Sequence, residues 1–140
     1  MPHATFTPLR RINVPNGDVL HALKATEQSF VGFGEAYFSI IHPKAIKGWK
    51  RHNRMTLNLI VPCGEIQISI HDDRRESTAS YRLGPDRSET YGRLTIEPGL
   101  WVAFGGIGDG LNVMLNISDI PHDPSEADAL PLNAIEWKWE

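Results

Sequence analysis

Two runs of alternating apolar residues, joined by a short turn, constrain the fold more than any other part of the chain. Residues 55–61 carry an apolar side chain at every second position, and residues 65–71 do so with Ile66, Ile68 and Ile70. Side chains of a strand alternate between the two faces of a sheet, so each run predicts a strand with one buried face. The Pro-Cys-Gly between them predicts a hairpin turn.

The same alternation recurs along the chain, with turn residues such as Glu-Pro-Gly between the runs. Many short strands at regular spacing are typical of an antiparallel sandwich or barrel. The chain has 140 residues and no linker rich in Pro, Gly or Ser, which predicts one all-β domain over residues 1–140. The further strands are expected at 35–42, 92–97, 99–104 and 111–117.

Two short helices are also expected, one near each end of the chain. Residues 16–25 resemble a helix with Asp18 as its N-cap. Residues 123–130 resemble one or two helical turns, in which Asp123 is the cap and Glu126 completes a capping box. The aromatic tail after residue 133 is expected to pack back onto the sheet.

Composition excludes several classes of function. The formal net charge is −3 and the charges are mixed along the chain, which argues against a nucleic-acid binder. No apolar run is long enough to span a bilayer, and the first residues contain no apolar core of a signal peptide. Cys63 is the single cysteine, which fits a reducing cytoplasm.

The basic stretch Lys-Gly-Trp-Lys-Arg-His-Asn-Arg at 47–54 raises the question of a metal site. A pair of histidines spaced by two would share one face of a strand and could bind a metal. Here the first position is Lys50, and a protonated lysine has no lone pair to offer. Only His52 remains, and the other histidines are scattered singly. We therefore expect no catalytic metal and no cofactor.

Taken together, the segments resemble the cupin superfamily, and more narrowly its RmlC-like sugar-nucleotide epimerases, such as dTDP-4-dehydrorhamnose 3,5-epimerase. The resemblance implies a metal-free jelly-roll barrel, usually a homodimer, whose mouth binds a nucleotide-linked keto-sugar. It covers about the whole chain and is carried by GDVLHALK, GEAYFS, KGWKRHNRMTLNLIVPCGEI, HDDR, ETYGRLTIEPGLWVAFGG, LNI, PHDP and the final Trp139.

The chain departs from the family at the positions that carry catalysis. The resemblance places Lys50 at the family's catalytic histidine, Lys47 at its phosphate-binding arginine, and Asn116 at its proton-donating tyrosine. A second tyrosine position matches His122. In the related sugar 3,4-ketoisomerases, which carry two histidines spaced by two here, His52 matches the second. Other family positions are occupied by Leu57, Val102 and, where an aspartate orients the base, Asn133.

Proton transfer beside a ketone needs a base, an acid on the other face and a group that stabilises the enolate. Histidine is the side chain most often suited to gain and lose a proton near neutral pH, so His52 is the expected base, with Lys50 as the cation beside the enolate and Tyr37 as the acid. Alternation places Lys50 and His52 on one face. Lys47, Trp49 and Arg51 are expected on the other face or at the strand end. The expected substrate-binding residues are Lys47, Arg54, Arg74, Asn116 and His122.

Three classes of function follow. The first is an epimerase or isomerase acting on a dTDP-4-keto-6-deoxy sugar, in deoxysugar or cell-surface polysaccharide biosynthesis. The second is a divergent metal-free cupin enzyme acting on another carbonyl compound. The third is a catalytically degenerate cupin that binds a nucleotide-sugar or another small ligand. In each case the partner is a small molecule, with no nucleic acid and no membrane, and the protein is expected to be a homodimer.

Overall fold

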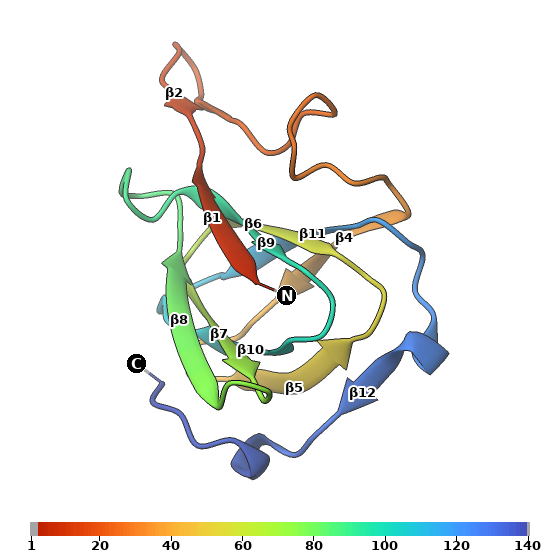
Figure 1. The fold of residues 1–140 in the computed structure, drawn as a ribbon. Coiled ribbons are helices and arrows are strands. Elements are labelled where there is room, and N and C mark those ends of the chain that lie inside the picture. Colours follow the sequence, from red (N-terminus) through yellow and green to blue (C-terminus); the bar gives the residue numbers. More distant parts are fainter. Residues whose placement is uncertain (1–2, 140) are drawn as a thin grey trace.

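The computed structural model describes residues 3–139, and in it two five-stranded antiparallel sheets face each other (Figure 1). In spatial order, the first sheet, called the β6 sheet, consists of β1 (Ala4–Pro8), β9 (Gly92–Ile96), β6 (Leu57–Cys63), β11 (Val113–Ser118) and β4 (Glu35–Ile40). The second, the β7 sheet, consists of β12 (Ala127–Ala129), β5 (Ile46–His52), β10 (Trp101–Gly106), β7 (Ile66–Asp72) and β8 (Ser77–Leu83). This arrangement confirms the all-β cupin jelly roll.

The core lies between the two sheets and is built by the predicted alternation. Leu59 and Val61 of β6 face Ile66 and Ile68 of β7, and all four side chains are fully buried. Burying an aliphatic side chain of this size contributes about 1.5–3 kcal/mol to stability. The hairpin predicted around Cys63 is wrong, because β6 and β7 belong to different sheets. The short turn after Cys63 instead carries the chain from one sheet to the other.

The helix expected after Asp18 is wrong. Residues Arg11–Ile12 (β2) and Val19–Leu20 (β3) instead pair as a small antiparallel ribbon. The dipeptide Asn16-Gly17 explains the error, since both residues have positive φ, +72° and +144°, and Asn-Gly is a strong signal for a turn between strands. Asp18 accepts a hydrogen bond from Nε of Arg11 at 2.9 Å rather than capping a helix.

The second expected helix is reduced to the 3-10 turn η1 (Pro124–Glu126). Asp123 caps it, as expected, by accepting a hydrogen bond from the Ser125 backbone N–H at 3.0 Å. The capping box is wrong, because the Glu126 carboxylate bonds to β5 and the loop after it. A second 3-10 turn, η2 (Leu132–Ala134), follows.

The aromatic tail packs back onto the β7 sheet, as expected. The ring centroids of Trp49 and Trp139 lie 6.3 Å apart, and Figure 1 shows β12 and the tail running outside β5. Trp49 and Trp101 are buried in this second apolar cluster. Among the residues that the structure describes, no helix is long and apolar enough to cross a membrane.

Candidate functional site

An irregularity in β5 determines which side chains this strand presents to the interior. Lys50 pairs with Val102 of β10, and Lys47 pairs with Phe104, so three steps on β5 match two steps on β10. Directly paired residues project from the same face of a sheet. Val102 and Phe104 both contact the core, so Lys47 and Lys50 project toward the interior.

The bulge changes one expectation drawn from alternation. A regular strand would place Lys47 on the outer face with Trp49, whereas the extra residue turns Lys47 inward. Gly48 makes this possible, because its φ is +152° and a Cβ there would lie 2.4 Å from that of Ala103. His52, two residues beyond Lys50, continues the inward-facing row.

The facing wall of the interior carries a phenol and an amide. Tyr37 of β4 and Asn116 of β11 are directly paired, and Asn116 also pairs with the core residue Leu59, so both project inward. Asn116 is buried and donates to the Ser39 hydroxyl at 3.2 Å. Tyr37 is 41% exposed, because β4 is the edge strand of its sheet. Lys47 and Lys50 on the facing sheet are exposed as well.

His52 is held in place by a buried carboxylate. Its Nδ1 lies 2.5 Å from Oε1 of Glu126, whose side chain is 1% exposed. The other oxygen, Oε2, accepts hydrogen bonds from three successive backbone N–H groups, those of Asn53, Arg54 and Met55, at 3.0–3.2 Å. One carboxylate therefore fixes both the imidazole and the turn after β5. With the proton of Nδ1 shared with Glu126, Nε2 is the nitrogen that can accept a proton.

The pKa values of Glu126 and Tyr37 are shifted in opposite directions, which suits the two groups to different roles. Burial alone would raise the pKa of Glu126, but the hydrogen bond to His52 and those from the Arg54 and Met55 backbone together lower it below its usual value of 4.5. Burial, followed by the nearby charge of Glu35, raises the pKa of Tyr37 above 10. Glu126 is thus an anion at neutral pH, whereas the phenol keeps its proton.

The other three residues expected to bind the substrate, Arg54, His122 and Arg74, differ in where they lie. Arg54 follows β5 and pairs with Asp123 at 2.9 Å, with its side chain exposed. The backbone N–H of His122 donates to Glu35 at 2.9 Å, which ties it to the start of β4. Arg74 lies in the β7–β8 turn, 3.6 Å from Asp72, and β10 separates β7 from β5. The expected site residues that project into the barrel interior are therefore Lys47, Lys50, His52, Tyr37 and Asn116. Arg74 lies away from them.

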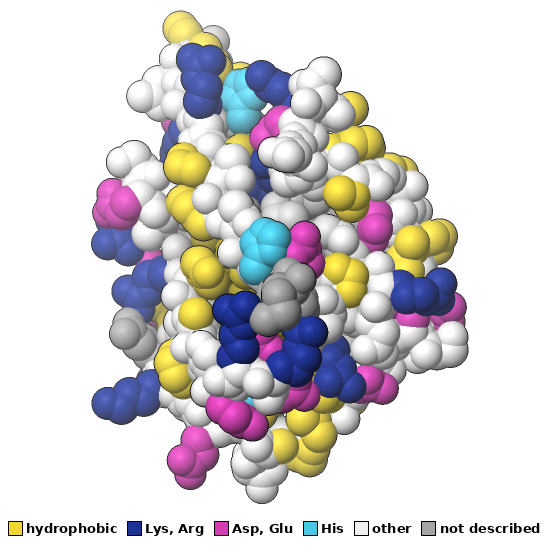
Figure 2. All heavy atoms as spheres, viewed as in Figure 1, with side chains coloured by type: hydrophobic (Ala, Val, Ile, Leu, Met, Phe, Trp, Pro, Cys, Tyr) yellow, Lys and Arg dark blue, Asp and Glu magenta, His cyan; other side chains and the backbone are white. Residues whose placement is uncertain are grey.

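Other basic residues are already engaged outside the barrel. Arg51 pairs with Asp73 at 3.2 Å and Asp128 at 2.9 Å, and stacks on Trp101 at 4.7 Å. On the face seen in Figure 2, basic side chains lie among acidic ones. Within residues 3–139, no three His, Cys, Asp or Glu side chains are grouped closely enough to hold a metal ion.

The sequence did not identify Glu126 as a functional residue. The resemblance pointed to Asn133 for the group that orients the base, and Asn133 lies in η2. Glu126 reaches His52 because β12, a strand of three residues, pairs with β5 so that Ala127 lies opposite His52. A strand this short has no periodicity, so no local pattern could indicate its partner.

Comparison with known proteins places this geometry in a family. A dTDP sugar isomerase from Desulfovibrio desulfuricans is 37% identical, and the match covers 94% of this chain and 85% of that one, with a TM-score of 0.87. The fold is also that of dTDP-4-dehydrorhamnose 3,5-epimerase from Bacillus anthracis, with TDP and PPi bound, at 16% identity and a TM-score of 0.79, covering 96% of this chain and 84% of that one. The chain belongs to the RmlC-like family of dTDP-sugar epimerases and isomerases.

A curated relative is also named as an epimerase. The Haloferax volcanii protein named "Probable low-salt glycan biosynthesis epimerase Agl13" is 27% identical over 96 residues. That match covers 66% of this chain and 62% of the relative's length. A search against protein-family models found no match.

Proposed function

We propose that this protein transfers protons beside the ketone of a dTDP-4-keto-6-deoxy sugar, as an epimerase or isomerase. The observation that carries the proposal is the buried Glu126 carboxylate that fixes His52 on the interior wall, two residues from Lys50. Membership of the RmlC-like family and the names of its relatives support this substrate class and a role in deoxysugar or glycan biosynthesis.

Each residue has a distinct part in the proposed reaction. Nε2 of His52 removes the proton from the carbon beside the ketone, and Glu126 stabilises the imidazolium that forms. The ammonium of Lys50, on the same wall, stabilises the enolate oxygen. Lys47 lies farther along the same face and offers its charge to the diphosphate, because phosphates are recognised by such cations.

Tyr37 is the proposed acid, and its position explains how the family's missing phenol is replaced. The family tyrosine position is Asn116, and Tyr37 is its direct cross-strand partner on β4. Directly paired residues have Cβ atoms only about 4.5–5.5 Å apart, so the phenol is displaced by one strand but stays on the same wall. Base and acid then stand on opposite sheets, and a sugar bound between them can lose a proton on one face and gain one on the other.

A binding protein without catalysis is the second candidate. Lys50 and Asn116 stand where the resemblance expects a histidine and a tyrosine, which favours a pocket that binds a nucleotide-sugar but leaves it unchanged. An enzyme for another carbonyl compound would use the same His52 and Lys50 with a different ligand.

One pair of measurements separates these candidates. We expect thymidine diphosphate to raise the melting temperature, since a ligand of the native state stabilises it. We also expect deuterium from D₂O to enter the carbon beside the ketone of dTDP-4-keto-6-deoxyglucose, followed by NMR. A thermal shift without exchange would support the binding protein, and the absence of both would support a different substrate.

Replacing Tyr37 with phenylalanine tests the acid. Loss of a positioned acid costs about 10²–10⁴-fold in rate, so we expect that much less inverted or isomerised product. Solvent exchange at the carbon attacked by His52 should persist, because the enolate still forms and can regain a proton from the His52 face. The matched control is Tyr81→Phe, on β8 at the far side of the sheet from β5. Equal product formation by Tyr37→Phe and wild type would exclude Tyr37 as the acid.

We also propose that the protein is a homodimer through the outer face of β4. Phe38 and Ile40 project outward from this edge strand and are 69% and 46% exposed, and the nearby Phe33 is 64% exposed. Aromatic and aliphatic side chains in this density on one face are typical of an interface between proteins.

A charge on this face should separate the subunits. We expect Phe38→Asp to sediment as a monomer at micromolar concentration, where the wild type sediments as a dimer, because a carboxylate would be buried without a partner. Thr26→Asp, at an exposed loop position, serves as the control. Wild-type protein that sediments only as a monomer would refute the dimer.

A further inference from the structure

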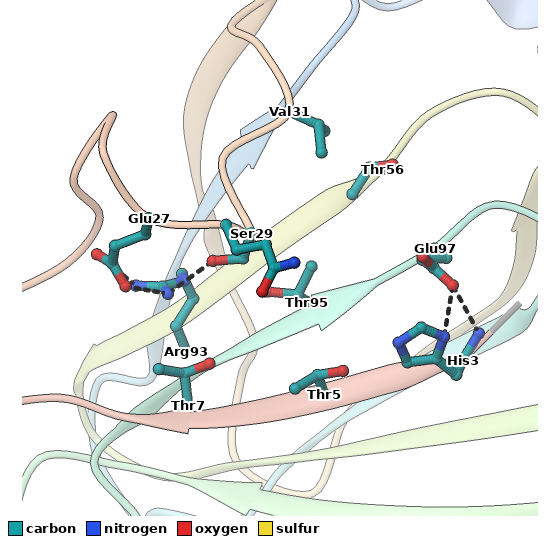
Figure 3. A pocket seen from close by; sticks show the side chains of 11 residues that line it. His3, Thr5, Thr7, Glu27, Ser29, Val31, Thr56, Arg93, Thr95 and Glu97 are labelled. Atoms are coloured by element: carbon teal, nitrogen blue, oxygen red, sulfur yellow. Dashed lines mark hydrogen bonds and ion pairs between the residues drawn. The ribbon is translucent and has the colours of Figure 1, made fainter.

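A polar cleft on the outer face of the β6 sheet is not used by the proposed reaction. Its volume is about 580 Å³, within the range of about 300–1,000 Å³ usual for small-molecule sites. It lies between β1, β9 and the segment 27–31, which crosses the sheet on its outer side (Figure 3). Four of its lining residues are threonines, so we call it the threonine cleft: Thr5, Thr7, Thr56 and Thr95.

Register explains why the threonines gather here. Thr5 pairs with Thr95 across β1 and β9, while their neighbours Phe6, Leu94 and Ile96 project into the core. The outward side chains of the two strands therefore form a polar surface, and the segment 27–31 lines the cleft on one side. The interior of the barrel and the threonine cleft lie on opposite faces of the same sheet.

The charged groups of the threonine cleft are paired with one another. At one end, Arg93 donates to Glu27 at 2.7 Å and to the Ser29 hydroxyl at 2.8 Å, and it is fully buried. At the other end, Nδ1 of His3 lies 2.6 Å from Glu97. Dashed lines in Figure 3 mark both pairs, with Thr5 and Thr95 between them. Among the described lining residues, the two basic side chains, Arg93 and His3, each have a carboxylate partner, so the cleft does not suit a phosphate.

Most of the neutral polar side chains that line the cleft, in contrast, have no hydrogen-bond partner among the described residues. Within residues 3–139, the hydroxyls of Thr5, Thr7 and Thr56 and the amide of Gln28 make no hydrogen bond to the protein, whereas Thr95 donates to Asn58. A hydroxyl both donates and accepts, and so does an amide, so these groups match a ligand whose own polar groups are hydroxyls. Among the described lining residues none is Phe, Tyr or Trp, which disfavours a nucleobase, since bases bind by stacking.

We propose that the threonine cleft binds an uncharged sugar at a site separate from the interior wall of β5. The ligand class follows from a cleft of ligand size, with paired charges and several free hydroxyl and amide groups on its walls. The proposal does not depend on the proton-transfer reaction, because no residue of the interior wall lines this cleft.

The test is an NMR titration of ¹⁵N-labelled protein with glucose, rhamnose and maltose, and separately with sodium phosphate. We expect saturable shifts of the Thr5, Thr7, Ser29 and Thr95 amides with at least one of the three sugars below about 100 mM, and none with phosphate. The double variant Thr5→Val, Thr7→Val keeps the shape of the strand but removes two hydroxyls. It should weaken binding about tenfold, the loss expected for two hydrogen bonds.

Thr26→Val is the matched control, because Thr26 directly precedes the crossing segment 27–31 and does not line the cleft. It should bind the sugar as the wild type does. The proposal is overturned if no sugar gives saturable shifts at these amides, if phosphate gives the same shifts, or if the double variant binds with unchanged affinity. Amide shifts restricted to Tyr37, Lys50 and His52 would place the sugar in the barrel interior and would equally overturn it.

Discussion

His52→Ala is expected to lower solvent deuterium exchange into dTDP-4-keto-6-deoxyglucose by about 10²–10⁴-fold, the usual effect of removing a general base. Alanine leaves no group on β5 that Glu126 can orient, and the ammonium of Lys50 cannot accept a proton. Binding of thymidine diphosphate, measured by calorimetry, should stay within a few-fold of wild type, because the charge assigned to the diphosphate is that of Lys47.

Two further variants make the result specific. His42→Ala replaces an exposed histidine in the β4–β5 loop and should exchange at the wild-type rate. Lys50→Ala should slow exchange without abolishing it, since it removes the cation beside the enolate and not the base. If His52→Ala exchanges as fast as wild type, the base is another residue, and Lys50 and Tyr37 become the groups to test.

The barrel itself could be predicted from alternation, because one-sided burial leaves a period of two in the sequence. Ile66, Ile68 and Ile70 show this most clearly, and their inward face was correctly assigned. Among the edge strands of the two five-stranded sheets, β1, β8 and β12 were not predicted. In β8 the apolar period is weak, since Ser77 to Leu83 contains only two large apolar residues, Tyr81 and Leu83. An edge strand buries less surface and needs fewer apolar side chains.

The candidate site could be predicted only in part, for a different physical reason. Residues on one strand, such as Lys50 and His52, are related by a period that the sequence contains. The inward turn of Lys47 depends on a bulge at Gly48, where a single glycine gave no unambiguous signal. The contact of Glu126 with His52 spans 74 residues and arises from the pairing of two strands, which no local pattern records.

Glu126→Gln is expected to reduce exchange by roughly 10²–10⁴-fold although His52 remains, since an amide cannot stabilise the imidazolium and can hold the wrong tautomer. The affinity for thymidine diphosphate should be unchanged, which separates an orienting role from a binding role. A control at a neighbouring carboxylate is Asp128→Asn, which touches Arg51 and Asn53 on the outer side and should leave exchange intact. Exchange by Glu126→Gln at the wild-type rate would refute the orienting role.

The same variant should change the acid dependence of stability. The pKa of Glu126 is lower in the folded protein than its usual value of 4.5, so its ionised form stabilises the fold at pH values above 4.5. That contribution is lost as the pH falls through the lowered folded-state pKa, because the proton then bound breaks the contacts with His52 and the backbone. At pH 7, Glu126→Gln should therefore lower the free energy of unfolding by about 1–3 kcal/mol, which is measured as a lower urea midpoint. Below pH 4.5 the two urea midpoints should converge, and a constant difference from pH 7 to pH 3 would show that the charge of Glu126 does not stabilise the fold.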